Sequence, residues 1–252
     1  MRNVSLRELL EAGCHFGHQV ARWNPKAGEF IYGAREGIHI IDLVKTKQAL
    51  EKAVEFLKQQ AASGKTIIFV GTKRQAKVYL KEEAQRCQVF YISERWIGGL
   101  ITNWDEVKKN LDRIRKLEED IKNVEGVYTK AEVMKKQVKL QRLLKFYGGI
   151  KDLKTPPDVL FVVDVKREQN AVREALKVGT PVVAVVDTNS DPNSVTIPVP
   201  ANDDAAGSLK LIISVIADAV LEGKEMKDKK EEEVKKVAQK EEKAKESKLK
   251  KS

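Results

Sequence analysis

The side chains with the most direct capacity for chemistry are histidines and aspartates that fall in loops. His15 and His18 lie three residues apart in a glycine-bounded bend. Aspartates follow apolar runs late in the chain, at Asp187, Asp191, Asp203 and Asp204. Imidazole nitrogens and carboxylate oxygens together suit a hard or borderline metal cation, so a metal site is one interpretation. The other is that the histidines form hydrogen bonds within the bend and the aspartates cap loops. Both interpretations stay open at this point.

Cations and tryptophans share two further loops. The first contains Arg22, Trp23 and Lys26, and the second contains Arg95, Trp96 and Asn103. Unpaired RNA bases stack on aromatic rings and guanidinium planes, and basic side chains neutralise phosphates, so both loops are candidates for RNA contact. For the first loop, the alternative is that Trp23 only anchors the loop to the core.

A third basic segment follows an apolar run at 66–71, where Lys73 and Arg74 open a predicted helix. The amino end of a helix attracts anions, so these two cations suit a phosphate held from outside. The turn has a single glycine, Gly71, and matches neither a dinucleotide fingerprint nor a P-loop. No G-x-S-x-G nucleophile elbow is present either. We therefore expect no cofactor and no enzymatic activity.

Composition favours an anionic partner. The chain has 252 residues, a formal net charge of +10 and 42% apolar residues. A basic balance of this size indicates nucleic acid before a membrane surface. No apolar run approaches the ~18 residues that a membrane helix needs, and the first residues lack the apolar core of a signal peptide. Cys14 and Cys87 have no metal-binding spacing. We expect a cytosolic protein without membrane contact.

Apolar runs and amphipathic segments alternate along the chain, which predicts an α/β fold with a parallel sheet. Strands are expected near 66–71, 89–92, 159–164 and 182–187, and a hairpin is expected at 30–41. Helices are expected at 5–12, 45–62, 72–87, 168–178 and 205–221. The strand, helix and strand between 159 and 187 form a βαβ unit, whose strands should be parallel with a right-handed crossover.

Residues 103–147 predict two antiparallel helices inserted into this domain. The first arm carries a heptad seam at Val107, Leu111, Ile114, Leu117, Ile121 and Val124. Gly126 should end that arm, and Thr129 with Glu132 should cap the second, which directs Met134 and Val138 toward its partner. Candidate RNA-binding cations on the arms are Lys108, Lys109, Lys135, Lys136, Lys139 and Arg142. A solvated, charged coiled coil is the alternative.

The domain organisation follows from these segments. Residues 1–102 and 148–222 form the α/β domain, and 103–147 form the helical insertion. Residues 223–252 are mainly lysine and glutamate, too poor in apolar surface to fold alone, so we expect a disordered tail.

Several strings, taken in order, closely resemble one family. They are LLEAGCHFG at 9–17, RWNPK at 22–26, GIHIIDL at 37–43, FVGTKRQA at 69–76, RWIGGLITN at 95–103, PDVLFVVD at 157–164, DTNSDP at 187–192 and NDDA at 202–205. The resemblance is to bacterial small ribosomal subunit protein two, and it covers about residues 1–222. It implies a flavodoxin-like parallel sheet with helices on both faces and a protruding helical hairpin.

The same resemblance implies a structural role in translation. The expected partners are small-subunit rRNA, which the family binds late in assembly, and other ribosomal proteins, including the large RNA-binding protein one. Positions that match family motifs and could face RNA, or support those that do, are Arg22, Trp23, Lys26, Lys73, Arg74, Arg95, Trp96 and Asn103.

Two other functions are compatible with the residues alone. A flavodoxin-like enzyme would bind a small phosphorylated ligand at the strand-end loops around Thr72 and Asp187. A protein–protein adaptor would use the hairpin, and it predicts exposed apolar residues there outside the seam.

Overall fold

A parallel five-stranded sheet forms the centre of the molecule. The computed structural model describes residues 4–122 and 129–249, with side chains up to residue 229. The strands are β5 (Phe90–Ile92), β4 (Ile67–Val70), β6 (Val159–Val163), β7 (Val182–Val186) and β8 (Ile197–Pro200), in that spatial order. All neighbouring pairs are parallel. This order is that of flavodoxin-like folds, so the predicted fold class is confirmed.

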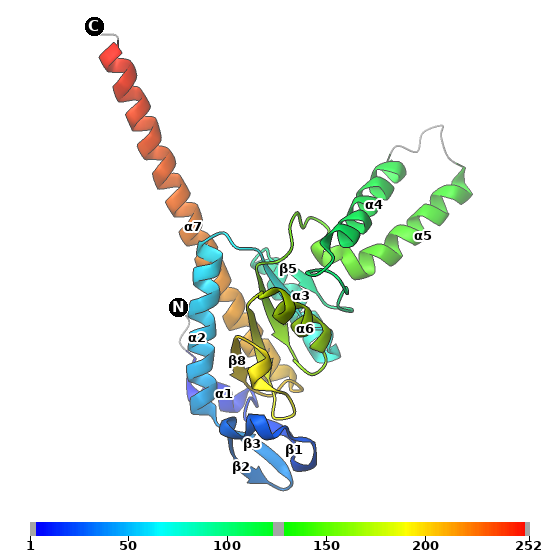
Figure 1. Cartoon of the computed structure of the whole chain (residues 1–252), viewed down its shortest axis with the longest axis vertical. Coiled ribbons are helices and arrows are strands. Elements are labelled where there is room, and N and C mark those ends of the chain that lie inside the picture. Colours follow the sequence, from blue (N-terminus) through cyan, green and yellow to red (C-terminus); the bar gives the residue numbers. More distant parts are fainter. Residues whose placement is uncertain (1–3, 123–128, 250–252) are drawn as a thin grey trace.

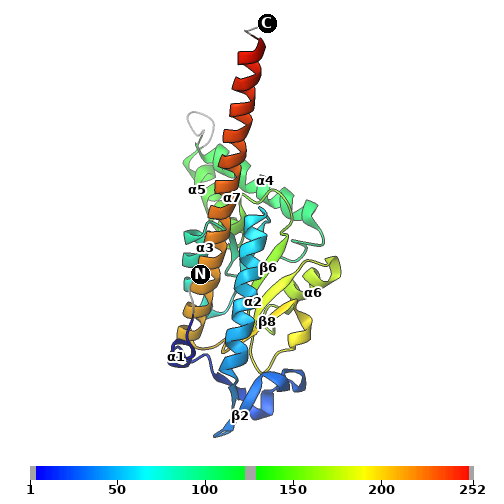
Figure 2. The ribbon, with the colours of Figure 1, turned by 90° about the vertical axis from the view of Figure 1, so that its left-hand side faces the viewer.

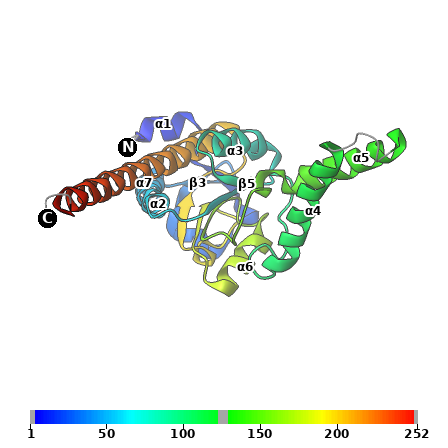
Figure 3. The same ribbon diagram turned by 90° about the horizontal axis from the view of Figure 1, so that it is seen from above.

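Helices cover both faces of this sheet (Figures 2 and 3). Alternate strand residues point to opposite cores, so Phe69 and Phe161 belong to one and Val70 and Leu160 to the other. The first core is closed by α1 (Leu6–Glu11), α2 (Leu43–Ala62), α3 (Arg74–Arg86) and α7 (Ala206–Leu249). The second is closed by α6 (Gln169–Val178) and the base of α4 (Trp104–Lys122). Burial on both faces explains why the strands read as unbroken apolar runs.

A small antiparallel sheet lies at the carboxyl edge of the large one (Figure 1). Its strands are β1 (Phe16–Gln19), β3 (Ile38–Ile41) and β2 (Ile31–Arg35), in that order, with short 3-10 helices at Val20–Arg22 and Pro25–Phe30. The predicted hairpin is confirmed, whereas β1 was predicted only as a bend. Gly17 is required in β1 because a Cβ there would lie 2.7 Å from Thr188 Cγ2.

The inserted helices α4 and α5 (Lys130–Tyr147) pack against each other and project from the domain (Figure 1). Thr129 and Glu132 form the predicted capping box at the start of α5. A 3-10 turn at Gly148–Ile150 returns the chain to β6. Val124 and Gly126, for which a seam position and a helix end were predicted, lie outside the described residues.

The last helix differs from its prediction. It was expected to end at Leu221, with a disordered tail from residue 223, but α7 continues to Leu249. Its middle part remains packed, because Glu222 forms an ion pair with Lys58 at 2.7 Å and Lys224 Nζ donates to the carbonyl oxygen of Gln88 at 2.6 Å. No described helix has the length and apolar content to cross a membrane.

Candidate functional site

The hairpin packs through the predicted seam of α4. Val107, Leu111, Ile114 and Leu117 are buried there, as expected from the heptad spacing. The predicted orientation of α5 is wrong, because Met134 and Val138 are exposed by 63% and 42%. The half-buried positions of α5 are instead Val133, Lys136, Leu140, Leu143, Leu144 and Tyr147. This inner face is one residue out of phase with the predicted one.

The cations of the hairpin divide into paired and unpaired groups. Lys136 Nζ lies 2.7 Å from Asp120 Oδ2 on the facing helix, and Lys109 Nζ lies 2.6 Å from Glu106 Oε1. Lys135, Lys139 and Arg142 are exposed and spaced by four and three, so they form one row on the outer face of α5. Among the described residues, this row has no ion-pair partner, and Lys108 is exposed as well.

An aromatic ring and a groove adjoin the α5 row. Phe146 is 41% exposed, and Lys145 Nζ lies 5.8 Å from the centre of its ring. These two residues line an open groove of about 620 Å³ between α5 and α3, to which Lys77 and Lys81 also contribute. Exposed cations beside an aromatic ring are the combination that single-stranded nucleic acid requires. Sequence reasoning did not select Lys145 or Phe146 as a pair.

A second groove, of about 600 Å³, lies at the base of the hairpin and contains three arginines. Arg95, Arg167 and Arg173 line it, and all three are exposed. Arg95 was predicted to bind RNA. Arg167 lies in the loop before α6 and Arg173 lies in α6, and neither was predicted. There was little reason in the sequence to select these two arginines, because cations on an amphipathic helix usually only face the solvent.

Trp96, which was predicted to face RNA or to support residues that do, lies buried in this segment. The side chain is 7% exposed, and its Nε1 donates to Glu174 Oε1 at 3.0 Å. The same carboxylate accepts from the backbone nitrogen of Gly99 at 2.8 Å. Trp96 therefore anchors the loop that leads to exposed Asn103 and α4, which fits a residue that supports its neighbours from inside.

The first tryptophan loop remains open to solvent. Trp23 is 41% exposed, with its ring 5.3 Å from that of His39, and Arg22 is exposed. Lys26 is also exposed, although its Nζ forms an ion pair with Asp191 at 2.6 Å. The loop is thus joined to the 187–192 loop but still presents a cation and a ring.

Lys73 and Arg74 differ in their exposure to solvent. Arg74 is exposed at the first turn of α3, as a phosphate contact requires. Lys73 is only 9% exposed, and its Nζ lies 2.6 Å from Asp203, 2.6 Å from Asp204 and 3.3 Å from Asp164. The prediction that Lys73 faces a phosphate is therefore wrong. Its ammonium group lies among carboxylates from the loops that follow β6 and β8.

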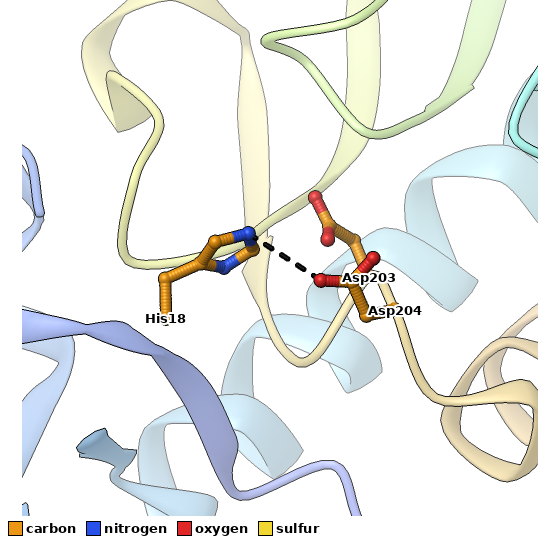
Figure 4. Close-up of side chains that lie close together, drawn as sticks. All are labelled: His18, Asp203 and Asp204. Atoms are coloured by element: carbon orange, nitrogen blue, oxygen red, sulfur yellow. Dashed lines mark ion pairs between the residues drawn. The ribbon is translucent and has the colours of Figure 1, made fainter. Parts of the chain in front are cut away.

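A histidine–carboxylate cluster lies beside Lys73 at the carboxyl ends of the strands, and Figure 4 shows three of its members, His18, Asp203 and Asp204. His18 Nδ1 lies 3.0 Å from Asp187 Oδ1, and His18 Nε2 lies 3.4 Å from Asp204 Oδ2. The hydrogen bond with Asp187 raises the pKa of His18 against the opposing effect of burial. Burial, together with the nearby carboxylates, raises the pKa of Asp203 to about 7.

Only part of the predicted histidine–aspartate set enters this cluster. His18, Asp203 and Asp204 each offer a ligand atom within 4.8 Å of the others. His15 instead contacts the ring of Phe16, with centroids 4.0 Å apart, and Asp191 pairs with Lys26.

The fold and these side chains define a flavodoxin-like protein whose basic surface lies on a projecting helical hairpin and at its base. The chain matches the family model described as Ribosomal protein S2 over residues 9–223. Small ribosomal subunit protein uS2 of Dictyoglomus thermophilum is 51% identical over 91% of this chain and 94% of its own length. The uS2c protein of Porphyra purpurea is 50% identical over 89% of this chain and 93% of its own length. The uS2 protein of a Synechocystis strain is 48% identical over 88% of this chain and 82% of its own length. The chain therefore belongs to the ribosomal protein S2 family.

Membership in this family confirms the resemblance found in the sequence. The protein is a structural component of the small ribosomal subunit that takes part in translation, and it is not an enzyme. Its surroundings are the rRNA and the other proteins of that particle in the cytoplasmic ribosome. The hypothesis of a flavodoxin-like enzyme is thereby excluded.

Proposed function

We propose that this protein binds small-subunit rRNA directly, and that the exposed cation row on α5 supplies phosphate contacts. The row consists of Lys135, Lys139 and Arg142. The observation that carries the proposal is that these three cations lack carboxylate partners among the described residues, whereas Lys136 beside them is paired with Asp120. Each phosphate that such a cation neutralises releases condensed counterions, which drives binding.

The loops at the other end of the domain serve to orient the protein on the RNA. Exposed Arg22 and Trp23 present a cation beside a ring that an unpaired base can stack on. The arginine-lined groove adds Arg95, Arg167 and Arg173 near the hairpin base. Guanidinium groups bind phosphate in a fixed, two-pronged geometry, so this groove suits a bent RNA backbone. Such contacts set register and orientation and carry little sequence information.

A reconstitution experiment tests this function. Small subunits are assembled with the variant Lys135→Glu, Lys139→Glu and Arg142→Glu, or with a control in which three scattered exposed lysines, Lys52, Lys177 and Lys210, are changed to glutamate. Both variants have the same net charge. After sedimentation through high salt, we expect the α5 variant to be lost and the control to stay bound. Equal retention of the two would contradict a role for the α5 row.

The family resemblance implies that this protein helps the large RNA-binding ribosomal protein one to dock, and we also propose that the hairpin supplies the surface for it. Met134 and Val138 are exposed on α5 outside the seam, which is what an adaptor surface predicts. Burying such side chains against a partner favours association by about 25 cal/mol per Å². Changing both to serine should reduce the amount of protein one on isolated subunits while leaving this chain bound. Unchanged protein one content would refute this second role.

A further inference from the structure

The outer face of α5 continues from cations to an aromatic ring. Lys135, Lys139 and Arg142 are followed by Phe146, so the residues are spaced by four, three and four. Side chains with this spacing lie on one face of a helix. At 1.5 Å of rise per residue, the face from Lys135 to Phe146 is about 16 Å long. The row of positive charge therefore ends at an exposed apolar ring.

The groove between α5 and α3 begins at this ring. Phe146 lines it from α5, and Val78 lines it from α3. These side chains are 41% and 59% exposed, so the groove presents apolar surface from both helices. Its volume of about 620 Å³ falls within the range of about 300–1,000 Å³ that is usual for sites of small organic molecules. A flat nucleobase therefore has room beside Phe146.

The charges of the groove favour an anionic partner. Lys77 Nζ lies 2.9 Å from Glu94 Oε2, so these two charges neutralise each other. The other charged residues that line the groove are Lys81, Lys145 and Glu82, which leave a net positive charge. Lys145 Nζ lies 5.8 Å from the centre of the Phe146 ring. A base stacked on that ring would thus have an ammonium group close to its own phosphate.

The remaining polar side chains of the groove suit the edge of an unpaired base. Gln85 and Ser93 also line it, and an amide and a hydroxyl can each donate and accept hydrogen bonds. An unpaired base offers the donors and acceptors of its Watson–Crick edge, whereas a paired base has them occupied and its faces covered within the stack. The groove therefore fits a single strand and not a duplex.

We propose that the α5 row and the groove together bind an unpaired segment of the small-subunit rRNA, with one of its bases stacked on Phe146. This inference rests on the proposed function, because the row supplies the phosphate contacts, and it adds the form of RNA that is bound. The groove is continuous with the row, so one strand can occupy both. Every base has a π-face, so the ring selects unpaired RNA with little preference for sequence.

The first test measures binding of the full chain to a short oligouridylate and to an RNA duplex of the same length. Phe146→Leu should weaken binding of the single strand by about fivefold or more, since a base stacked on an aromatic ring contributes about 1–3 kcal/mol. Binding of the duplex should not change, and Phe146→Tyr should bind as the unchanged chain does. Tyr32→Leu is the matched control, because that ring is 81% exposed on β2, outside the groove.

The salt dependence separates this inference from the proposed function. Phe146→Leu removes no charge, so it should lower the affinity without changing the salt slope, whereas the glutamate variant of the α5 row should lower the slope. If the α5 variant behaves as expected but Phe146→Leu binds the single strand as tightly as the unchanged chain, the inference is overturned and the proposed function stands. An equal loss for the duplex, or an equal loss in Tyr32→Leu, would also overturn it.

A second readout uses assembled small subunits. Their rRNA is probed with a reagent that modifies the exposed edges of unpaired bases. At least one unpaired base that the unchanged chain protects should become reactive in subunits with Phe146→Leu, and it should stay protected with Tyr32→Leu. The same protection pattern with Phe146→Leu as with the unchanged chain would contradict a base held in the groove.

Discussion

Replacing Glu174 by alanine should loosen the base of the hairpin at a measurable cost. Oε1 of this α6 side chain accepts from Trp96 Nε1 at 3.0 Å and from the Gly99 nitrogen at 2.8 Å. Oε2 accepts at 3.4 Å from the Ile101 nitrogen and at 3.3 Å from Thr102 Oγ1. Hydrogen bonds to a charged group contribute about 1.5–3 kcal/mol each when well formed. Two are short, two are long and the carboxylate is partly exposed, so we expect a loss of about 2–4 kcal/mol.

The variant Glu174→Gln separates the charge from the geometry. Its amide oxygen can still accept the two short bonds, so we expect a loss of only about 1 kcal/mol, as for a neutral hydrogen bond. The assay is urea unfolding followed by circular dichroism, together with native-state hydrogen exchange at the Gly99 amide. Exchange there should accelerate in the alanine variant. An alanine variant within about 0.5 kcal/mol of the unchanged chain, the range of ordinary surface substitutions, would refute the reasoning.

Three further predictions concern packing and pH. Leu111→Ala should lower the free energy of unfolding in urea by about 2–5 kcal/mol, because the side chain is 1% exposed. Met134→Ala should lower it by under about 0.5 kcal/mol, because that side chain is 63% exposed. Gly223→Val should lower the melting temperature by pushing α7 from α2, since a Cβ there would meet the backbone carbonyl of Lys58. Burial raises the pKa of Cys87 from 9.0 to about 11. The unfolded chain therefore releases this proton first, so stability should fall from pH 9 to about 11, less steeply in Cys87→Ala.

Periodicity made the fold predictable where one face of an element is strongly apolar. The heptad of α4 placed Leu111 and Ile114 correctly, and unbroken apolar runs located the parallel strands. The phase of α5 could not be read in this way. Its inner face contains Lys136, which is accommodated by Asp120 on α4, while apolar Met134 points to solvent. An ion pair across a hairpin leaves no signal in either helix alone.

The candidate site was predictable only in its outline. Parallel strands end at one edge of a sheet, so Asp187 and Asp203 were expected to lie near one another. Lys73 and Trp96 resemble exposed RNA-binding residues in the sequence, but their partners Asp203 and Glu174 come from distant segments. Burial that depends on such long-range pairing is not encoded in local spacing.

The most direct test of the proposed role is the salt dependence of binding to small-subunit rRNA. The logarithm of the binding constant is measured against the logarithm of salt concentration for the unchanged chain, for the variant with glutamate at Lys135, Lys139 and Arg142, and for the scattered-lysine control. Each lost phosphate contact lowers the slope by roughly 0.7–0.9, so the α5 variant should lose about 2–3 units. The control should keep the slope of the unchanged chain. An α5 variant with an unchanged slope would contradict the account.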